Sequence, residues 1–260
     1  MKPNSRTEAG FTLIELLMVV AIIGILAALL LATISMAKRY AKSVVCKNHL
    51  HQMGLALQMY VHENQDQYPR YLGPGGNSYG ETGGGIGVAG LVYWSSKLFP
   101  YYPVNWTNSS FQCPGYRGKV SGPYDKDSIE RLGSYAYNGG GVALHDLEFF
   151  GLGPYSRWKD AQGKVVPPVS EAKISAPSDM LAICDSLMKV ELPGGSDFGR
   201  GSQPFASQLA AEPYVLPHGK NFNLLFCDGH VTAMNPWILF NPTNSAAMWN
   251  YDHQPHPEFW

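Results

Sequence analysis

The chain has 260 residues, with 19 basic and 20 acidic side chains and a formal net charge of −1. This balance excludes a protein that holds nucleic acid by many phosphate contacts, because such proteins need a surplus of lysine and arginine. The 28 glycines and 19 prolines favour short strands joined by long loops over a regular alternation of strands and helices.

The first predicted element is an apolar segment from Phe11 to Met36, which follows a polar leader of ten residues. About 20 apolar residues span a bilayer, so the segment is long enough for a membrane helix. A cleaved secretory signal has a shorter apolar core and carries its small residue after that core. Here Gly10 precedes the apolar run, which argues against an ordinary signal peptide.

Glu15 is the only charged residue in this apolar run. A charge at bilayer depth costs roughly 2.5–3.5 kcal/mol on insertion scales, so an acid there indicates a functional site. An ordinary signal anchor would explain the length of the run but not an acid five residues after a glycine.

Gly10 followed by Phe11-Thr12-Leu13-Ile14-Glu15 resembles the prepilin leader of type IV pilins and type II secretion pseudopilins. The resemblance implies that prepilin peptidase cuts after Gly10 and methylates the new N-terminus at Phe11. Glu15 then lies one helical turn from a free amine, and it can neutralise the amine of an adjacent subunit during filament assembly. We expect that pair to be desolvated, so that loss of either partner costs several kcal/mol.

Basic residues flank the apolar segment on both sides. Lys2 and Arg6 precede it, and Lys38, Arg39 and Lys42 follow it, so the positive-inside rule does not decide the orientation. The resemblance implies a single pass through the inner membrane. The N-terminus is then cytoplasmic and the rest of the chain is periplasmic, or extracellular once it is in a filament.

Beyond the membrane segment, apolar residues recur at steps of three and four. These residues are Cys46, Leu50, Met53, Leu57, Tyr60 and Val61. Such spacing marks one face of a helix, and no proline interrupts the stretch, so we predict one helix from Phe11 to His62. Its second half, residues 37–62, is expected to pack on a globular domain, and Gly24 and Gly54 are tolerated as weak points.

Several short elements are predicted in the remainder, at 63–260. We expect a short helix at 94–100, an extended piece at 111–114, a strand running into a turn at 134–141, a buried strand at 180–185, loops at 73–90 and 194–213, and an irregular tail at 249–260. Asp228-Gly229 separates two β-prone runs, 223–227 and 230–234, which is a strong signal for a hairpin.

A second resemblance spans the chain but does not cover its loops. His218, nine further residues and then Asp228-Gly229 resemble the His-x9-Asp-Gly element of a pseudopilin-like family from planctomycete and verrucomicrobial bacteria. Further matching pieces lie at 46–50, 54–57, 111–114 and 134–138, and the tail at 250–257 is similar to lentisphaeral members. Both resemblances imply an α+β, pilin-like fold in which a long N-terminal helix packs on a small antiparallel sheet.

The resemblance divides the chain into four parts. They are the leader at 1–10, the membrane or filament-core helix at 11–36, the amphipathic helix at 37–62 and the globular domain at 63–260, with the His-x9-Asp-Gly hairpin at 218–234.

His218, Asp228 and His230 form a candidate metal site, because a carboxylate with two imidazoles can hold zinc or iron. Calcium is the alternative that the secretion pseudopilins suggest. The turn by itself also explains Asp228, since aspartate bonds its own backbone there, and His218 can simply pin the first strand. The sequence has no nucleophile elbow, zinc-protease motif, P-loop or dinucleotide fingerprint, so we expect no enzyme and no other cofactor.

The four cysteines belong to a domain expected to be exported, where disulfides persist. Cys184 and Cys227 occupy matching strand ends, each between a hydrophobic residue and an aspartate, and they can face each other if the strands are neighbours. That pairing leaves Cys46 and Cys113 to pin the helix to the domain. Four buried, reduced thiols are the alternative.

These observations predict a structural subunit that assembles into a type II secretion pseudopilus or a type IV-like filament. The expected partners are prepilin peptidase, other pseudopilin subunits, an inner-membrane assembly platform and, before assembly, the lipid bilayer, but not nucleic acid. A surface pilin for adhesion or motility is an alternative within this class. A membrane-anchored periplasmic domain that binds or hydrolyses glycans, and uses the leader for sorting, is the alternative from another class.

Overall fold

The structure is a computed structural model of the chain. It describes residues 11–74, 91–103, 108–117, 120, 133–142, 149–154, 159–160, 162–186, 188–189, 214–215 and 217–259. Gly10, the predicted loop at 194–213 and most of the loop at 73–90 lie outside these residues. The chain divides into two compact units, residues 1–41 and 42–260.

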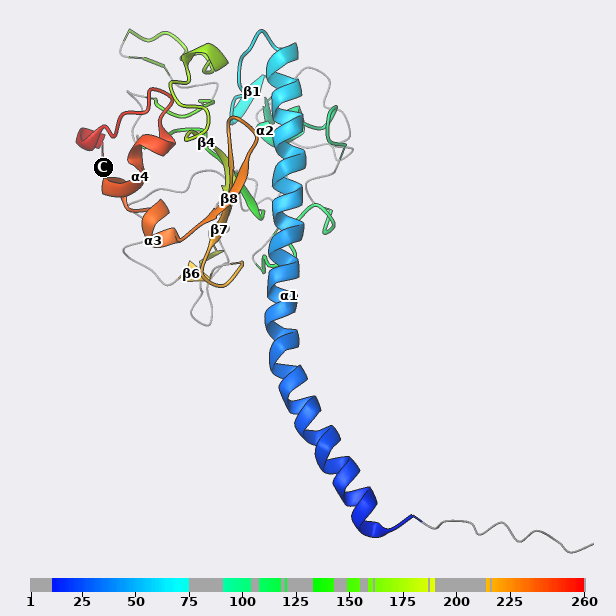
Figure 1. Ribbon diagram of the computed structural model, residues 1–260. Helices are drawn as coiled ribbons and strands as arrows, with labels where there is room; N and C mark the ends of the chain where they lie inside the picture. The colour runs from blue at the N-terminus through cyan, green and yellow to red at the C-terminus, as the bar shows by residue number, and fades with distance from the viewer. Residues whose placement is uncertain are drawn as a thin grey trace, which may run out of the picture. The chain divides into compact units, whose positions relative to one another are not determined.

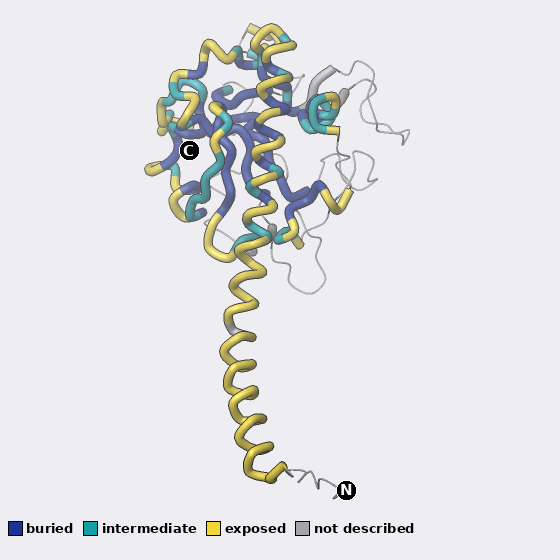
Figure 2. Tube along the Cα trace, turned by 45° about the vertical axis from the view of Figure 1, so that its right-hand side comes forward, coloured by how far each residue is buried: buried dark blue, intermediate teal, exposed yellow. Residues whose placement is uncertain are grey.

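Helix α1 is continuous over 51 residues, Leu13–Glu63, and it contributes to both units (Figure 1). Its bounds agree with the predicted helix to within two residues at either end. The side chains of residues 11–31 and 33–41 are exposed, and Figure 2 shows this part of the helix in yellow. By length and composition, α1 is long and apolar enough to cross a membrane.

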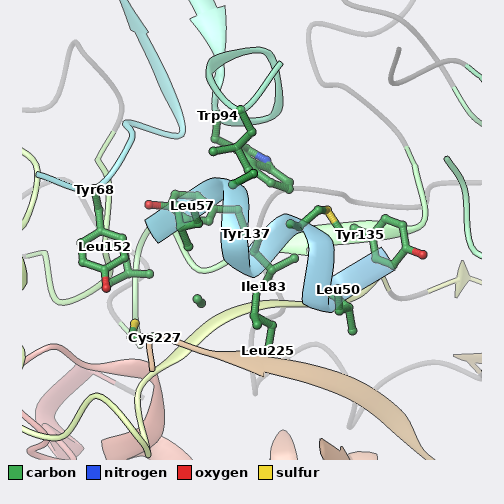
Figure 3. Packing of buried hydrophobic residues seen from close by; sticks show 14 of the residues in the cluster. Leu50, Leu57, Tyr68, Trp94, Tyr135, Tyr137, Leu152, Ile183, Leu225 and Cys227 are labelled. Carbon is green, nitrogen blue, oxygen red and sulfur yellow. The ribbon is translucent and has the colours of Figure 1, made fainter. Parts of the chain in front are cut away.

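The second part of α1 buries the face that the apolar spacing predicts. Its buried residues are Cys46, Leu50, Met53, Gly54, Ala56, Leu57 and Val61. Figure 3 shows Leu50 and Leu57 gathered with Tyr137 and Ile183 in one hydrophobic cluster. The helix lies so close to the sheet at Gly54 that an added Cβ atom would be 2.8 Å from Cδ1 of Leu225.

The sheet beside this helix is four-stranded and antiparallel, in the order β3-β4-β7-β8. Its strands are β3 (Tyr135–Tyr137), β4 (Leu181–Asp185), β7 (Phe222–Phe226) and β8 (Val231–Met234). Cys184 is paired with Ala136 on one side and with Leu224 on the other, which places β4 inside the sheet.

Smaller elements surround the sheet. Two two-stranded sheets join β1 (Leu72–Pro74) to β2 (Leu91–Tyr93) and β5 (Met188–Lys189) to β6 (Tyr214–Val215), and the short helices are α2 (Trp94–Lys97), α3 (Pro236–Leu239), α4 (Pro242–Trp249) and the 3-10 helices Glu171–Lys173 and Pro257–Phe259. The predicted extended piece at 111–114 is instead a turn region, in which the Tyr116 amide donates to the Cys113 carbonyl at 2.9 Å.

The two faces of the four-stranded sheet pack against different helices, because side chains alternate along each strand. Tyr135 and Tyr137 share a hydrophobic cluster with α1, whereas Ala136 between them belongs to a second cluster with residues of α3 and α4. Leu225 and its neighbour Leu224 divide in the same way. The long helix on a small antiparallel sheet is the α+β, pilin-like arrangement that the sequence predicts.

Helices α3 and α4 were not predicted, although each carries a local start signal. Asn235 and Asn241 are their N-cap residues, and each side chain accepts a hydrogen bond from a backbone amide in the first turn, at 2.9 and 3.1 Å. Proline follows each asparagine at the first helical position, where its missing N–H has no cost. The predicted hairpin is present, with Gly229 at a φ of 90° in its turn.

Candidate functional site

The acid of the N-terminal helix caps the helix in which it lies. The Glu15 carboxylate Oε2 accepts hydrogen bonds from the Thr12 amide at 2.8 Å and from the Thr12 hydroxyl at 2.7 Å. The Glu15 amide in turn donates to Thr12 Oγ1 at 3.3 Å. This reciprocal pair is a capping box, which satisfies amides that have no partner at a helix start. The Thr-x-x-Glu pattern was the missed signal that the helix begins after Thr12 rather than at Phe11.

The structure separates the three residues of the predicted metal site. Asp228 and His230 lie together in the exposed hairpin turn, with Asp228 Oδ1 2.6 Å from His230 Nδ1, and the His230 ring stacks on Phe226. His218 precedes β7 and Asp228 follows it, so an extended strand keeps them apart. His218 instead lies beside Cys113 and Asp185, with its Nε2 3.1 Å from the Cys113 sulfur and 3.5 Å from Asp185 Oδ2.

Cys46 of α1 and Cys113 of the following turn region form a disulfide, with their Cα atoms 5.1 Å apart. Cys184 and Cys227 are both buried and carry free thiols, so the second predicted pair is not formed. The reason is strand direction. Cys184 is the last residue but one of β4 and lies opposite Leu224. Cys227 follows β7, and its amide donates to the carbonyl of Met180, which precedes the other end of β4. In two antiparallel strands, the C-terminal end of one lies beside the N-terminal end of the other, so two residues that both lie at C-terminal ends are far apart.

A cluster of four side chains that could each offer a metal ligand lies beside the Cys46–Cys113 disulfide. One ligand atom from each of Cys46, Cys113, Asp185 and His218 lies within 4.8 Å of all the others. Each residue comes from a different segment of the chain. The Asp185 side chain is fully buried, and that of His218 is 3% exposed.

Hydrogen bonds hold two of these residues in place. Ser134 Oγ accepts from the Cys113 amide at 2.8 Å, and Gln112 Oε1 accepts from both the amide and the hydroxyl of Ser134 at 2.7 Å. On the other side, Asp185 Oδ2 accepts from the Asn223 amide at 2.8 Å. The positions of Cys113 and Asp185 are thus set by the folded chain around them.

The environment of the cluster disfavours charge on both of its ionisable groups. Burial raises the pKa of Asp185 to about 8, although the hydrogen bonds from Asn223 and the charge of Lys47 oppose this shift. Burial together with Lys47 and Lys42 lowers the pKa of His218 to about 4. Among the described residues, neither Asp185 Oδ1 nor His218 Nδ1 has a hydrogen-bond partner, although both atoms are buried. Such orphaned polar atoms are costly unless something else satisfies them.

The sequence predicted the Cys46–Cys113 pair of this cluster, but not that Asp185 and His218 lie beside it. Asp185 belongs to the predicted strand 180–185 without a predicted role, and the sequence placed His218 with Asp228 and His230 instead. The local sequence contains no signal for the cluster, because its members are brought together by strand pairing and by the packing of α1.

Comparisons with known proteins agree with the N-terminal features. Residues 5–31 match the family described as the prokaryotic N-terminal methylation motif. A stretch of 59 residues is 42% identical to type II secretion system core protein G of Pseudomonas aeruginosa. That stretch covers 23% of this chain and 42% of the relative, so the chain matches less than half of the length of this curated relative. No solved structure matches. The prepilin-type motif and this similarity support a type IV pilin or pseudopilin.

Proposed function

We propose that the chain is a structural pseudopilin, cleaved after Gly10 by prepilin peptidase, methylated at Phe11 and assembled into a type II secretion pseudopilus or a type IV-like filament. The observation that carries this proposal is the methylation motif at the start of an exposed apolar helix. A helix of this kind can occupy the bilayer before assembly and the filament core afterwards. The name of the curated relative favours the secretion pseudopilus over a surface pilus.

The remaining parts of the proposal follow from this one. The leader is cytoplasmic, the helix crosses the inner membrane once, and the Lys42–Trp260 unit is exported. The partners are prepilin peptidase, an assembly platform and other subunits of the filament. The domain contributes packing surface, and no enzymatic turnover is assigned to it.

Processing provides the direct test. Wild-type protein recovered from cells that contain prepilin peptidase is expected to begin with N-methylated Phe11, as read by mass spectrometry of the N-terminal peptide. Gly10→Val is expected to remain uncut, because a branched side chain does not fit a site built for glycine. Gly24→Val adds the same side chain within the helix, where nothing lies within 4 Å, and it is expected to be processed normally. A mature N-terminus at any other residue contradicts the proposal.

A further inference from the structure

We propose that, when the Cys46–Cys113 disulfide is reduced, the chain binds one zinc-like divalent cation through Cys46, Cys113, His218 and Asp185. The ligand atoms are the two sulfurs, His218 Nε2 and a carboxylate oxygen of Asp185. This site does not depend on filament assembly, and it differs from the exposed Asp228–His230 pair.

The donor set and its spacing fit such an ion. Zinc prefers four ligands in a tetrahedron, with sulfur at about 2.3 Å and nitrogen or oxygen at about 2.0–2.2 Å, which places ligand atoms about 3.4–3.8 Å from each other. His218 Nε2 is 3.1 Å from the Cys113 sulfur and 3.5 Å from Asp185 Oδ2. The four atoms already lie within 4.8 Å of one another, so the two sulfurs have to move apart once their bond is broken and the other atoms have to shift by about 1 Å or less.

Asp185 and His218 also have buried polar atoms without hydrogen-bond partners in the described part of the chain, which a bound cation could compensate. Asp185 is a fully buried acid, and its Oδ2 accepts from the Asn223 backbone amide and lies 3.5 Å from His218 Nε2, while its Oδ1 has no partner among the described residues. A buried acid oxygen without a partner is costly, and coordination of the Asp185 carboxylate to a divalent ion would satisfy it. His218 Nδ1 faces no partner among the described residues, while its Nε2 is the nitrogen that points to the sulfur and the carboxylate.

The disulfide and the metal exclude each other, because the same two sulfurs serve both. A dithiol reductant donates two electrons and two protons, the S–S bond breaks, and the reductant becomes a disulfide. The two thiols and the Asp185 carboxyl then release their protons to solvent as the cation binds two thiolates and a carboxylate. In the reverse direction, a disulfide oxidant takes two electrons from the thiolates and two protons from solvent and becomes a dithiol, while the protein S–S bond forms and the cation leaves.

Both states join α1 to the turn of Cys113, and the cation would add two further ties. Cys46 belongs to α1, Asp185 ends β4, and His218 precedes β7, so the cation would tie the helix to two strands of the sheet as well as to the turn of Cys113. The thiol form is the form in which the chain is synthesised. The cation therefore holds the helix in place until the disulfide replaces it.

The test uses the full chain in detergent, reduced with a phosphine under anaerobic conditions, loaded with Zn²⁺ or Co²⁺ and freed of excess ion. We expect one tightly held ion per chain, and with Co²⁺ the absorption bands of tetrahedral thiolate coordination. Asp185→Asn and His218→Gln each keep the size of the side chain, and each is expected to weaken binding by more than about ten-fold. Circular dichroism shows whether these variants are folded.

Two controls separate this site from others. Cys184→Ala with Cys227→Ala removes the remaining thiols, and Asp228→Asn with His230→Gln removes the exposed pair. Both double variants are expected to bind as tightly as the wild type. The proposal is overturned if the oxidised protein binds the ion equally well, if the cobalt bands are absent, or if the exposed pair rather than Asp185 and His218 determines the affinity.

Discussion

The two parts of helix α1 show how differently one helix can use apolar residues. Apart from Glu15, residues 13–36 are apolar on every side, and those with a described exposure are exposed, whereas residues 42–63 are apolar along one face, and that face is buried. Both parts are continuous helix, so backbone propensity does not distinguish them. The distribution of apolar residues around the axis does, because a bilayer or filament core contacts all sides while a domain contacts only one.

The glycines of the two parts also differ in what surrounds them. A Cβ atom added at Gly24 has nothing within 4 Å, but one added at Gly54 meets Leu225 at 2.8 Å. Glycine in a helix interior costs roughly 1 kcal/mol relative to alanine. At Gly54 that cost is offset by the close contact between helix and sheet, so the residue is a packing feature and not merely a weak point.

The largest expected effect concerns the acid of the membrane part. Glu15→Gln retains a capping box but removes the charge, whereas Glu15→Leu removes both. If the charge neutralises the amine of a neighbouring subunit, both variants insert into the membrane but neither enters filaments. Loss of one partner of a desolvated pair costs about 3–5 kcal/mol, which is enough to abolish assembly.

The measurement is the filament fraction sheared from cells that lack wild-type subunits. Full assembly of Glu15→Gln alongside failure of Glu15→Leu would show that the cap, not the charge, is needed.

The next effect concerns the covalent link in the domain part. Cys46→Ala with Cys113→Ala removes a cross-link between residues that are 67 positions apart, for which the chain-entropy model gives about 4 kcal/mol. Cys184→Ala removes a buried thiol without opening a loop, and we expect it to cost about 1 kcal/mol. Urea unfolding of the oxidised full chain in the presence of a chelator measures both. Equal losses would mean that the disulfide adds nothing beyond the packing of its sulfurs.

Three leucines of α1 test the comparison directly. Leu50 is fully buried, Leu55 is 44% exposed on the same part of the helix, and Leu26 is 61% exposed on the membrane part. Leu50→Ala is expected to lower the unfolding free energy of the Lys42–Trp260 unit by about 2–5 kcal/mol, because it leaves a cavity. Leu55→Ala and Leu26→Ala are expected to change it by less than about 0.5 kcal/mol. A large loss at Leu55 would contradict the assignment of the buried face.

The smallest effect distinguishes the buried acid of the domain from the exposed acid of the membrane part. Because the pKa of Asp185 is raised to about 8, the folded chain keeps a proton that the unfolded chain has released. Stability therefore falls as pH rises toward 8, by about 1 kcal/mol between pH 7 and 8. The depressed pKa of His218 acts in the opposite sense, but only below about pH 6.5.

Asp185→Asn is expected to abolish this contribution. Unfolding of the oxidised protein at pH 7 and pH 8 measures it, and subtracting the variant from the wild type cancels the contributions of the free cysteines. An unchanged pH dependence in Asp185→Asn would show that the acid is already ionised in the folded chain.

The sequence by itself determined the features that depend on neighbouring residues. Apolar spacing located α1 and its buried face, Asp228-Gly229 located the hairpin, and the residues from Gly10 to Glu15 supplied the leader motif. The starts of helices α3 and α4 are also marked by local residues, an asparagine followed by a proline, although neither helix was predicted. These signals are readable because capping, turn formation and helical periodicity act over only a few residues.

Only the tertiary structure decided which distant residues meet. The order β3-β4-β7-β8 placed α1 and the pair α3–α4 on opposite faces, and its antiparallel direction separated Cys184 from Cys227. The same pairing carried Asp185 and His218 to the Cys46–Cys113 bridge and left Asp228 at the far end of β7. Strand register and packing arise from long-range contacts over the whole domain, so no local sequence pattern predicts such a cluster.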